Sequence, residues 1–176
     1  LTGSQKALAV PPGVSIVVLD SVAKERVLRN HCTCMYLDLK NALKNAERGQ
    51  TPFTPAVGIL LQIHARLHKL HIDGYEKEMK RIQHIAEDFR KKIEKLPLKF
   101  FSSSFSNAVT ALETREGIDA HRVFELLKNE YGIWICPNGG ELSKRVFRVG
   151  HIGALTVNDN DVLIDALNDL WKRGEL

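Results

Sequence analysis

The segment from residue 75 to residue 96 constrains the fold most, because its apolar residues recur with a clear helical period. Successive members are alternately four and three positions apart, which places them on one face of an α-helix. They are Tyr75, Met79, Ile82, Ala86, Phe89, Ile93 and Leu96. Charged residues of both signs fill most of the other positions, and Pro97 follows. We therefore expect a long helix with one packed and one solvated face, ended by the proline.

After this helix the sequence predicts a strand, strand, helix, strand, strand, helix order. Asp119 and Thr156 are suited to accept hydrogen bonds at helix starts. The run Thr156 to Asp159 resembles a capping box, with Asp in place of Glu. The predicted strands cover residues 98–101, 108–113, 133–136 and 145–150. We expect a compact α+β domain in which helices cover a small antiparallel sheet.

Before the long helix, a second periodic segment predicts a helix with an apolar face. Its apolar residues are Val57, Leu60, Leu61, Leu67 and Leu70. Thr54 followed by Pro55 is a common way to begin a helix. Such a start would suit a phosphate, and an ordinary cap without a ligand is the alternative. Gly74 interrupts the pattern, and a second, longer helix begins after it.

Two basic side chains are candidates for chemistry. Lys6 in Gly3-Ser4-Gln5-Lys6 precedes Pro11-Pro12-Gly13 and the apolar run 14–19, which predicts a buried strand. The rigid Pro-Pro-Gly turn would fix the backbone near Lys6 and so determine where the Lys6 amine lies. The alternative is an ordinary solvated lysine. Arg148 lies on the last predicted strand, where Phe147 and Val149 face the other side and Gly150 leaves room. A guanidinium there suits a carboxylate, and a solvated sheet face is the alternative.

Composition and charge narrow the class of protein. Hydrophobic residues make up 44 % and charged residues 26 % of the 176 positions, as in ordinary globular domains. The net charge is +4, but basic residues are interleaved with 21 acidic ones, so we expect no nucleic-acid partner. No apolar run is long enough for a membrane span, and we expect a cytoplasmic protein without a membrane partner. The chain begins with Leu1, and we expect it to be a piece of something longer.

The cysteines and histidines give no clear metal or disulfide pattern. Cys32, Cys34 and Cys136 include no CxxC pair, so we expect reduced thiols. His64, His68 and His71 lie four and three positions apart on one helix face, an arrangement that could bind zinc. Because no HExxH pattern accompanies them, we expect no metal site and favour a partly buried, hydrogen-bonded histidine face.

Three motifs in order resemble one known family. They are Gly3-Ser4-Gln5-Lys6 with Pro11-Pro12-Gly13, then Thr51-Pro52-Phe53-Thr54-Pro55, then Phe147-Arg148-Val149-Gly150-His151-Ile152-Gly153. This order is similar to the class V aminotransferases that use pyridoxal 5'-phosphate (PLP), in the branch of the alanine-glyoxylate, serine-glyoxylate and serine-pyruvate enzymes. The resemblance implies a mixed α/β and α+β fold. Residues 1–73 would be the C-terminal part of the large cofactor-binding domain, and 74–176 the small C-terminal domain.

The resemblance also implies roles for individual residues. Lys6 would form the Schiff base with PLP, and Arg148 would hold the α-carboxylate of the substrate. Thr54 and Thr51 would reach the cofactor phosphate, usually that of the neighbouring subunit of a dimer, although the family often has tyrosine in place of Thr51. Gln5 would also contact the cofactor.

The activity implied is transfer of an amino group between a small amino acid, alanine or serine, and glyoxylate or pyruvate. In the family, several cofactor-binding groups precede the lysine and are absent from this chain. We therefore expect the isolated chain to be inactive and to bind PLP weakly or not at all.

Two alternatives remain at the level of sequence. The first is another class V enzyme, such as a phosphonate aminotransferase or a desulfurase-like protein. A desulfurase needs a cysteine on a mobile loop, and Cys32, Cys34 and Cys136 do not lie in an obvious Gly/Ser-rich one. The second is a non-catalytic α+β interaction domain, in which helix 75–96 binds a partner and Lys6 is incidental.

Overall fold

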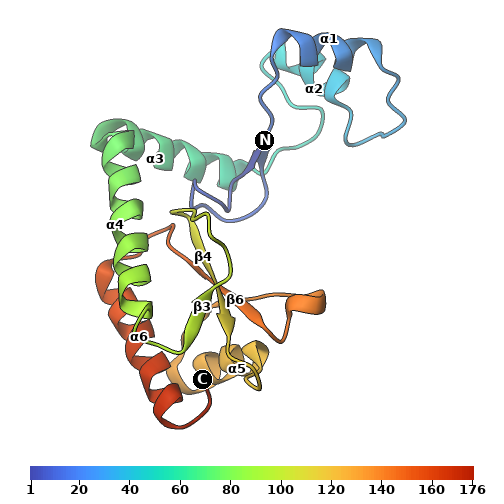
Figure 1. Ribbon diagram of the computed structural model, residues 1–176. Coiled ribbons are helices and arrows are strands. Elements are labelled where there is room, and N and C mark those ends of the chain that lie inside the picture. Colours follow the sequence, from blue (N-terminus) through green and yellow to red (C-terminus); the bar gives the residue numbers. More distant parts are fainter. The chain divides into compact units, whose positions relative to one another are not determined.

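The computed structural model describes residues 1–176, and the chain forms two compact units (Figure 1). The N-terminal unit comprises residues 1–69 and the C-terminal unit residues 70–176. Helix α3 (Val57–Asp73) contains the point of division.

The N-terminal unit combines a short β-ribbon with three helical segments. Strands β1 (Thr2–Gly3) and β2 (Ser15–Ile16) pair in an antiparallel sense. They are followed by α1 (Ser21–Arg29), α2 (Leu39–Ala46) and the first part of α3. The predicted buried strand over residues 14–19 is wrong, because only two of its residues pair and Val18 is 83 % exposed. An unbroken apolar run is typical of a strand covered on both faces, and this unit supplies only a two-residue partner.

The start of α3 differs from the prediction. Its first turn is closed by the N–H of Leu60, which donates to the carbonyl of Ala56 at 3.0 Å. Thr54 therefore precedes the helix without capping it. The predicted apolar face exists, but most of it is exposed: Val57, Leu60, Leu61 and Leu67 are open to solvent, whereas Ile63 and Leu70 are buried.

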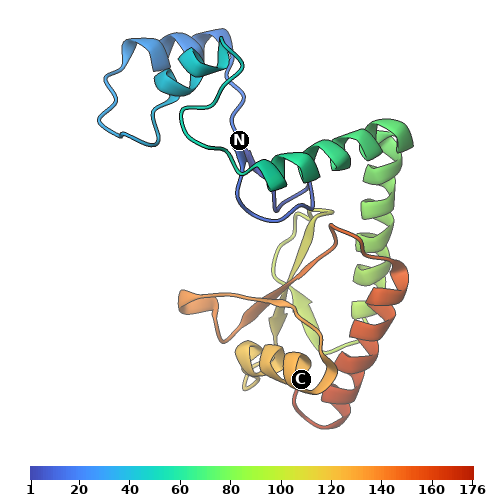
Figure 2. The same ribbon diagram turned by 180° about the vertical axis from the view of Figure 1, so that it is seen from behind.

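The C-terminal unit is the expected α+β arrangement. Its four strands are antiparallel in the order β3-β4-β6-β5. They are β3 (Leu98–Phe100), β4 (Val109–Thr114), β5 (Cys136–Pro137) and β6 (Val146–Gly150). The helices are α4 (Tyr75–Ile93), α5 (Ala120–Tyr131), η1 (Gly140–Leu142) and α6 (Val157–Lys172). In two opposite views α4 and α6 lie side by side against the sheet (Figures 1 and 2).

The long amphipathic helix is confirmed as α4, and its apolar face builds the core. Ile82, Ala86, Phe89 and Ile93 are buried, whereas Tyr75 and Met79 near its start are exposed. The core joins this face to one side of the sheet and to the apolar faces of α5 and α6. Among its fully buried members are Phe89, Leu112, Leu127, Phe147, Leu167 and Leu170.

The helix starts of this unit lie where the sequence predicts them, whereas one strand lies elsewhere. Asp119 caps α5, and Thr156 and Asp159 form the predicted capping box of α6. The strand predicted at 133–136 is instead β5, which begins at Cys136 and ends at Pro137. This short strand lies at the edge of the sheet, where a proline without an N–H is tolerated.

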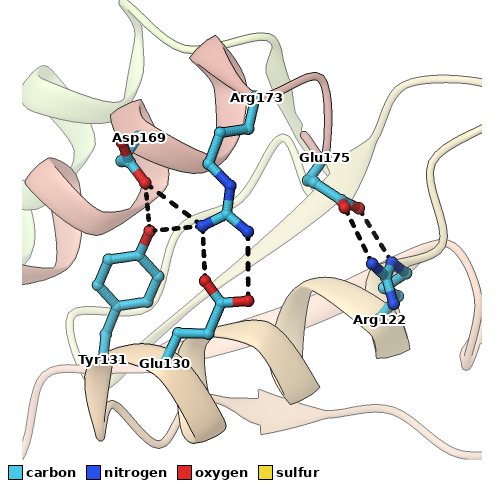
Figure 3. Close-up of polar contacts among 6 residues, drawn as sticks. All are labelled: Arg122, Glu130, Tyr131, Asp169, Arg173 and Glu175. Atoms are coloured by element: carbon cyan, nitrogen blue, oxygen red, sulfur yellow. Dashed lines mark hydrogen bonds and ion pairs between the residues drawn. The ribbon is translucent and has the colours of Figure 1, made fainter.

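A network of ion pairs fastens the C-terminal end of the chain to α5 (Figure 3). Arg173 donates to both carboxylate oxygens of Glu130, at 2.6 and 3.2 Å. Glu130 raises the pKa of this arginine. Tyr131 donates to Asp169 at 2.5 Å, and Arg122 donates to both carboxylate oxygens of Glu175. These contacts hold the last turn of α6 beside the core.

Candidate active site

Ser4 ties together the two ends of the loop that carries Lys6. This serine is fully buried. Its N–H donates to the carbonyl of Val14 at 2.9 Å, and its carbonyl accepts from Val10 at 3.1 Å. Its hydroxyl donates to the carbonyl of Pro11 at 2.8 Å and accepts from the N–H of Val14 at 3.3 Å. The backbone of the Lys6 loop is therefore closed by one buried residue.

Within the loop, successive tight turns present the Lys6 side chain to solvent. The N–H of Lys6 donates to Gly3, and the carbonyl of Lys6 accepts from Ala9 at 2.9 Å. Ala9 has φ 54°, a left-handed conformation that costs a residue with a Cβ roughly 1–2 kcal/mol. The Gln5 side chain folds over Gly3, where an added Cβ would lie 2.6 Å from Gln5 Oε1. Lys6 and Gln5 are both exposed.

A groove of about 620 Å³ lies elsewhere in the N-terminal unit. Residues 13–15 line one part of it, and residues 51–56 line another. Gly13 lies close to the first turn of α3, since an added Cβ there would be 3.3 Å from Ile59. The structure thus joins the segment that follows the Lys6 loop to the segment that contains Thr51 and Thr54. Lys6 and Gln5 do not line the groove.

The two threonines differ in their capacity to donate a hydrogen bond. The Thr51 hydroxyl already donates to the carbonyl of Phe53 at 2.6 Å, and the Phe53 ring stacks on Tyr36 with centroids 4.9 Å apart. Thr54 is exposed at the groove. A phosphate accepts hydrogen bonds and needs donors. Thr54 therefore fits a phosphate better than Thr51 does.

Arg148 lies in the C-terminal unit, on the side of β6 that faces away from the core. Its neighbours Phe147 and Val149 are buried in the core, as the alternation of a strand requires. Its Nη2 donates to Cys136 Sγ at 3.0 Å and to the carbonyl of Pro137 at 3.3 Å. Its Nε is buried and has no hydrogen-bond partner.

Small residues surround Arg148 on this face of the sheet. Ala111 of β4 and Cys136 of β5 lie directly opposite it on the two neighbouring strands. Two residues further along β6, an added Cβ on Gly150 would meet nothing within 4 Å. The prediction that Gly150 leaves room is confirmed. Open space beside a guanidinium is what a carboxylate ligand needs.

His151 follows Arg148 closely in sequence and is fully buried. Its Nε2 lies 2.8 Å from the Thr110 hydroxyl, whereas its Nδ1 has no partner. The ring packs against Phe89, with centroids 5.2 Å apart. Burial lowers the pKa of His151 to about 4, and the nearby Arg90 cation contributes. A neutral imidazole therefore supports the end of the strand that carries Arg148.

The histidines of α3 and the cysteines do not form a site. His64, His68 and His71 are exposed, so the predicted partly buried histidine face is wrong; the rings of His64 and His68 stack with centroids 6.3 Å apart. No cluster of three His, Cys, Asp or Glu side chains is arranged to hold a metal ion. All three cysteines are free thiols and exposed. No helix is both long and apolar enough to cross a membrane.

Sequence reasoning missed the contacts that Ser4, Cys136 and His151 make. Ser4 was visible only as part of a motif, because the partners of its hydroxyl lie 7 and 10 positions away. The contact of Cys136 with Arg148 depends on the pairing of β5 with β6. The sequence pattern predicted this strand three residues too early, so the pairing was not predicted. A histidine directly after a predicted strand was the available signal for His151.

Most of the similar proteins are named as aminotransferases, and two further relatives, 32 % and 31 % identical, are named as soluble hydrogenase subunits. No model of a protein family matches the chain. An uncharacterized aminotransferase of Methanocaldococcus jannaschii is 31 % identical over 87 % of this chain and 41 % of its own length. The L-aspartate–glyoxylate aminotransferase of Paracoccus denitrificans is 29 % identical over 89 % of this chain and 40 % of its own. The chain thus spans less than half the length of these relatives.

Solved structures place the fold in the same class. The alanine–glyoxylate aminotransferase from Nostoc sp. superposes with a TM-score of 0.87 at 26 % identity, over 96 % of this chain and 46 % of that one. The fold matches the C-terminal part of PLP-dependent aminotransferases. More narrowly, the chain is a homologue of the class V PLP-dependent aminotransferases, as the resemblance of its motifs predicted.

Proposed function

We propose that the protein containing this chain is a PLP-dependent aminotransferase that moves an amino group between alanine or serine and glyoxylate or pyruvate. The observation that carries the proposal is the similarity over nearly the whole chain to glyoxylate aminotransferases, in both sequence and fold. On this proposal, residues 1–73 belong to a large cofactor-binding domain and residues 74–176 form the small domain. A homodimer in the cytoplasm is part of the same proposal.

Lys6 is the residue we assign to the cofactor. When bound, PLP supplies an electron-withdrawing ring that stabilises the negative charge left on a substrate α-carbon. The fit of the residues is supported by the Lys6 loop, whose backbone is fixed by Ser4 while the amine is open to a ligand. The Lys6 amine takes the proton from the α-carbon. The loop fixes the backbone of Lys6 and leaves its exposed side chain free to reach a ligand.

Gln5 and the threonines are assigned to cofactor binding. Gln5 precedes Lys6 on the same loop, and its exposed amide can donate hydrogen bonds. Thr54 offers an exposed hydroxyl to a phosphate, and Thr51 ranks behind it because its proton is already donated to Phe53. Because Lys6 does not line the groove beside Thr54, we assign Thr54 to the cofactor of a second subunit.

Arg148 is the residue we assign to the substrate carboxylate. A guanidinium can donate two parallel hydrogen bonds to a carboxylate, and such charge-assisted bonds are roughly twice as strong as neutral ones. Binding the carboxylate fixes the orientation of the bond that is broken at the α-carbon. The small neighbours of Arg148 and the open space at Gly150 support this role.

Steady-state kinetics of the full-length protein test the proposal. Alanine, serine and aminoethylphosphonate are compared as donors, with glyoxylate and pyruvate as acceptors. We expect turnover with alanine or serine; Lys6→Ala should lower kcat at least about 100-fold. Arg148→Lys should raise KM about tenfold or more, because lysine does not offer the bidentate fork. The matched control Lys24→Ala, on an exposed part of α1, should change neither constant. Turnover only with the phosphonate, or an active Lys6→Ala variant, would contradict the proposal.

A further inference from the structure

One contact of Arg148 is not explained by its role toward a substrate. Strand β5 places Cys136 directly opposite Arg148 on the neighbouring antiparallel strand, so the two side chains share one face of the sheet. The cysteine is exposed, and it contributes to neither the core nor a disulfide. Its sulfur nonetheless lies 3.0 Å from Arg148 Nη2.

The geometry of this contact leaves the thiol free to accept a hydrogen bond. The Cys136 thiol can donate to the carbonyl of Pro137, whose oxygen lies 3.9 Å from the sulfur. The same carbonyl accepts from Arg148 Nη2 at 3.3 Å. Sulfur and carbonyl therefore hold one nitrogen of the guanidinium between them. The contacts are confined to Nη2, while Nε has no partner.

We propose that Cys136 is a positioning residue that orients the Arg148 guanidinium for a carboxylate. The inference rests on the proposed function, in which Arg148 binds the substrate carboxylate. Arginine has many rotamers, and fixing one of them before the ligand arrives reduces the entropy lost on binding. A sulfur atom suits this task because it accepts hydrogen bonds only weakly. A carboxylate, which binds a guanidinium much more strongly, can displace it.

Three substitutions at Cys136 separate positioning from packing. Cys136→Ala removes the acceptor, and we expect KM for the amino and 2-oxo acids to rise about three- to tenfold with kcat nearly unchanged. Cys136→Ser retains an acceptor and should restore KM to within about twofold of the original value. Cys136→Asp places a competing carboxylate opposite Arg148, and KM should rise at least about tenfold. Cys34→Asp, at an exposed cysteine of the N-terminal unit, is the matched control.

The kinetic outcomes distinguish this inference from the proposed function. If Arg148→Ala raises KM while Cys136→Ala and Cys136→Asp leave it unchanged, the positioning role is wrong and the proposed function stands. If Arg148→Ala leaves KM unchanged, Arg148 does not bind the carboxylate and both fail. If serine and alanine at position 136 give the same raised KM, Cys136 acts through its volume rather than as an acceptor, which also overturns the inference.

A second measurement needs no catalytic activity. In the 176-residue chain, the N–H group of Arg148 Nε is buried and can be followed by ¹H–¹⁵N NMR. We expect Cys136→Ala to shift or broaden this signal and Cys136→Ser to leave it near its original position. Cys34→Ala should have no effect. An Arg148 signal that is the same in the chain and in Cys136→Ala would show that the sulfur does not hold the guanidinium.

Discussion

At the scale of single residues, two buried polar side chains support the two basic residues that we assign to chemistry, the exposed Lys6 and the half-buried Arg148. Ser4 closes the loop of Lys6, and His151 lies at the end of the strand that carries Arg148. Neither is in a position to contact a ligand, because both are fully buried. Their contribution is to fix the backbone from which Lys6 and Arg148 extend. Buried polar groups of this kind are costly unless their hydrogen bonds are made.

The buried imidazole of His151 makes stability depend on pH. Its folded pKa of about 4 lies below the ordinary value of 6.5, so the unfolded chain takes up a proton between these values and the folded chain does not. The free energy of unfolding therefore falls as pH decreases through this window, by at most about 3 kcal/mol. Above pH 6.5 the effect is absent. Urea unfolding at several pH values measures it.

The matched variants isolate the histidine from the carboxylates that titrate at the same time. His151→Gln should lower the stability at neutral pH and flatten the decline between pH 6.5 and 4. His84→Gln, at an exposed position of α4, should retain the full decline. A decline that is equally steep in His151→Gln and in the original chain would show that His151 is not the group responsible.

At the scale of the elements, α5 ends in a way that gives a clean stability test. Gly132 has φ 68° and its N–H donates to the carbonyl of Leu127. An added Cβ would meet nothing within 4 Å, so Gly132→Ala introduces only backbone strain, which destabilises by about 1 kcal/mol. Gly139, with φ −104° and open surroundings, is the control, and Gly139→Ala should be nearly neutral. Thermal unfolding of both variants compares them; equal losses would refute the strain argument.

The elements also show how far the sequence predicts this fold. Helix α4 was predictable because its period survives over 19 residues and its apolar face is covered within this chain. The structure of the apolar run 14–19 was not predictable. Such a run forms a buried strand only where neighbouring strands cover it, and in this chain only Ser15 and Ile16 are paired. The start of α3 was misplaced because Thr54 and Pro55 give the usual signal, yet the first helical turn is closed at Ala56.

The candidate site was predictable to a different extent. The motifs around Lys6 and Arg148 identified these residues, because each motif consists of neighbouring residues and can be recognised in the sequence without knowledge of the fold. The contact between Cys136 and Arg148 depends on strand register across 12 positions, which propensity and periodicity do not fix. The same holds for the hydroxyl of Ser4, whose partners come from the far side of a loop.

At the scale of the whole molecule, the two units differ in how much they bury. The C-terminal unit has a continuous core formed by α4, α5, α6 and the sheet. In the N-terminal unit the buried residues are only Ser4, Val10, Asn45 and Ile63, while large apolar side chains such as Val18 and Met35 are exposed. Exposed apolar area of this extent marks an interaction surface. It supports our proposal that the chain works within a larger protein.

This difference predicts unequal protection from hydrogen exchange. Amides of α4, α5, β4 and β6 should exchange slowly, with opening free energies close to that of global unfolding. Amides of residues 14–56 should exchange fast, because few buried contacts hold them. Mass spectrometry of peptides from the 176-residue chain measures both. Protection of residues 14–56 equal to that of α4 would contradict the description of the N-terminal unit as weakly packed.

The identity of the lysine that carries the cofactor is the central claim, and one measurement tests it directly. The full-length protein is incubated with PLP, reduced with borohydride, digested and mapped by mass spectrometry. We predict that the label lies on Lys6 and that Lys6→Ala abolishes it. The same treatment of the 176-residue chain should give little or no label. A label on another lysine, such as Lys24 of α1, or a label that persists in Lys6→Ala, would contradict the account.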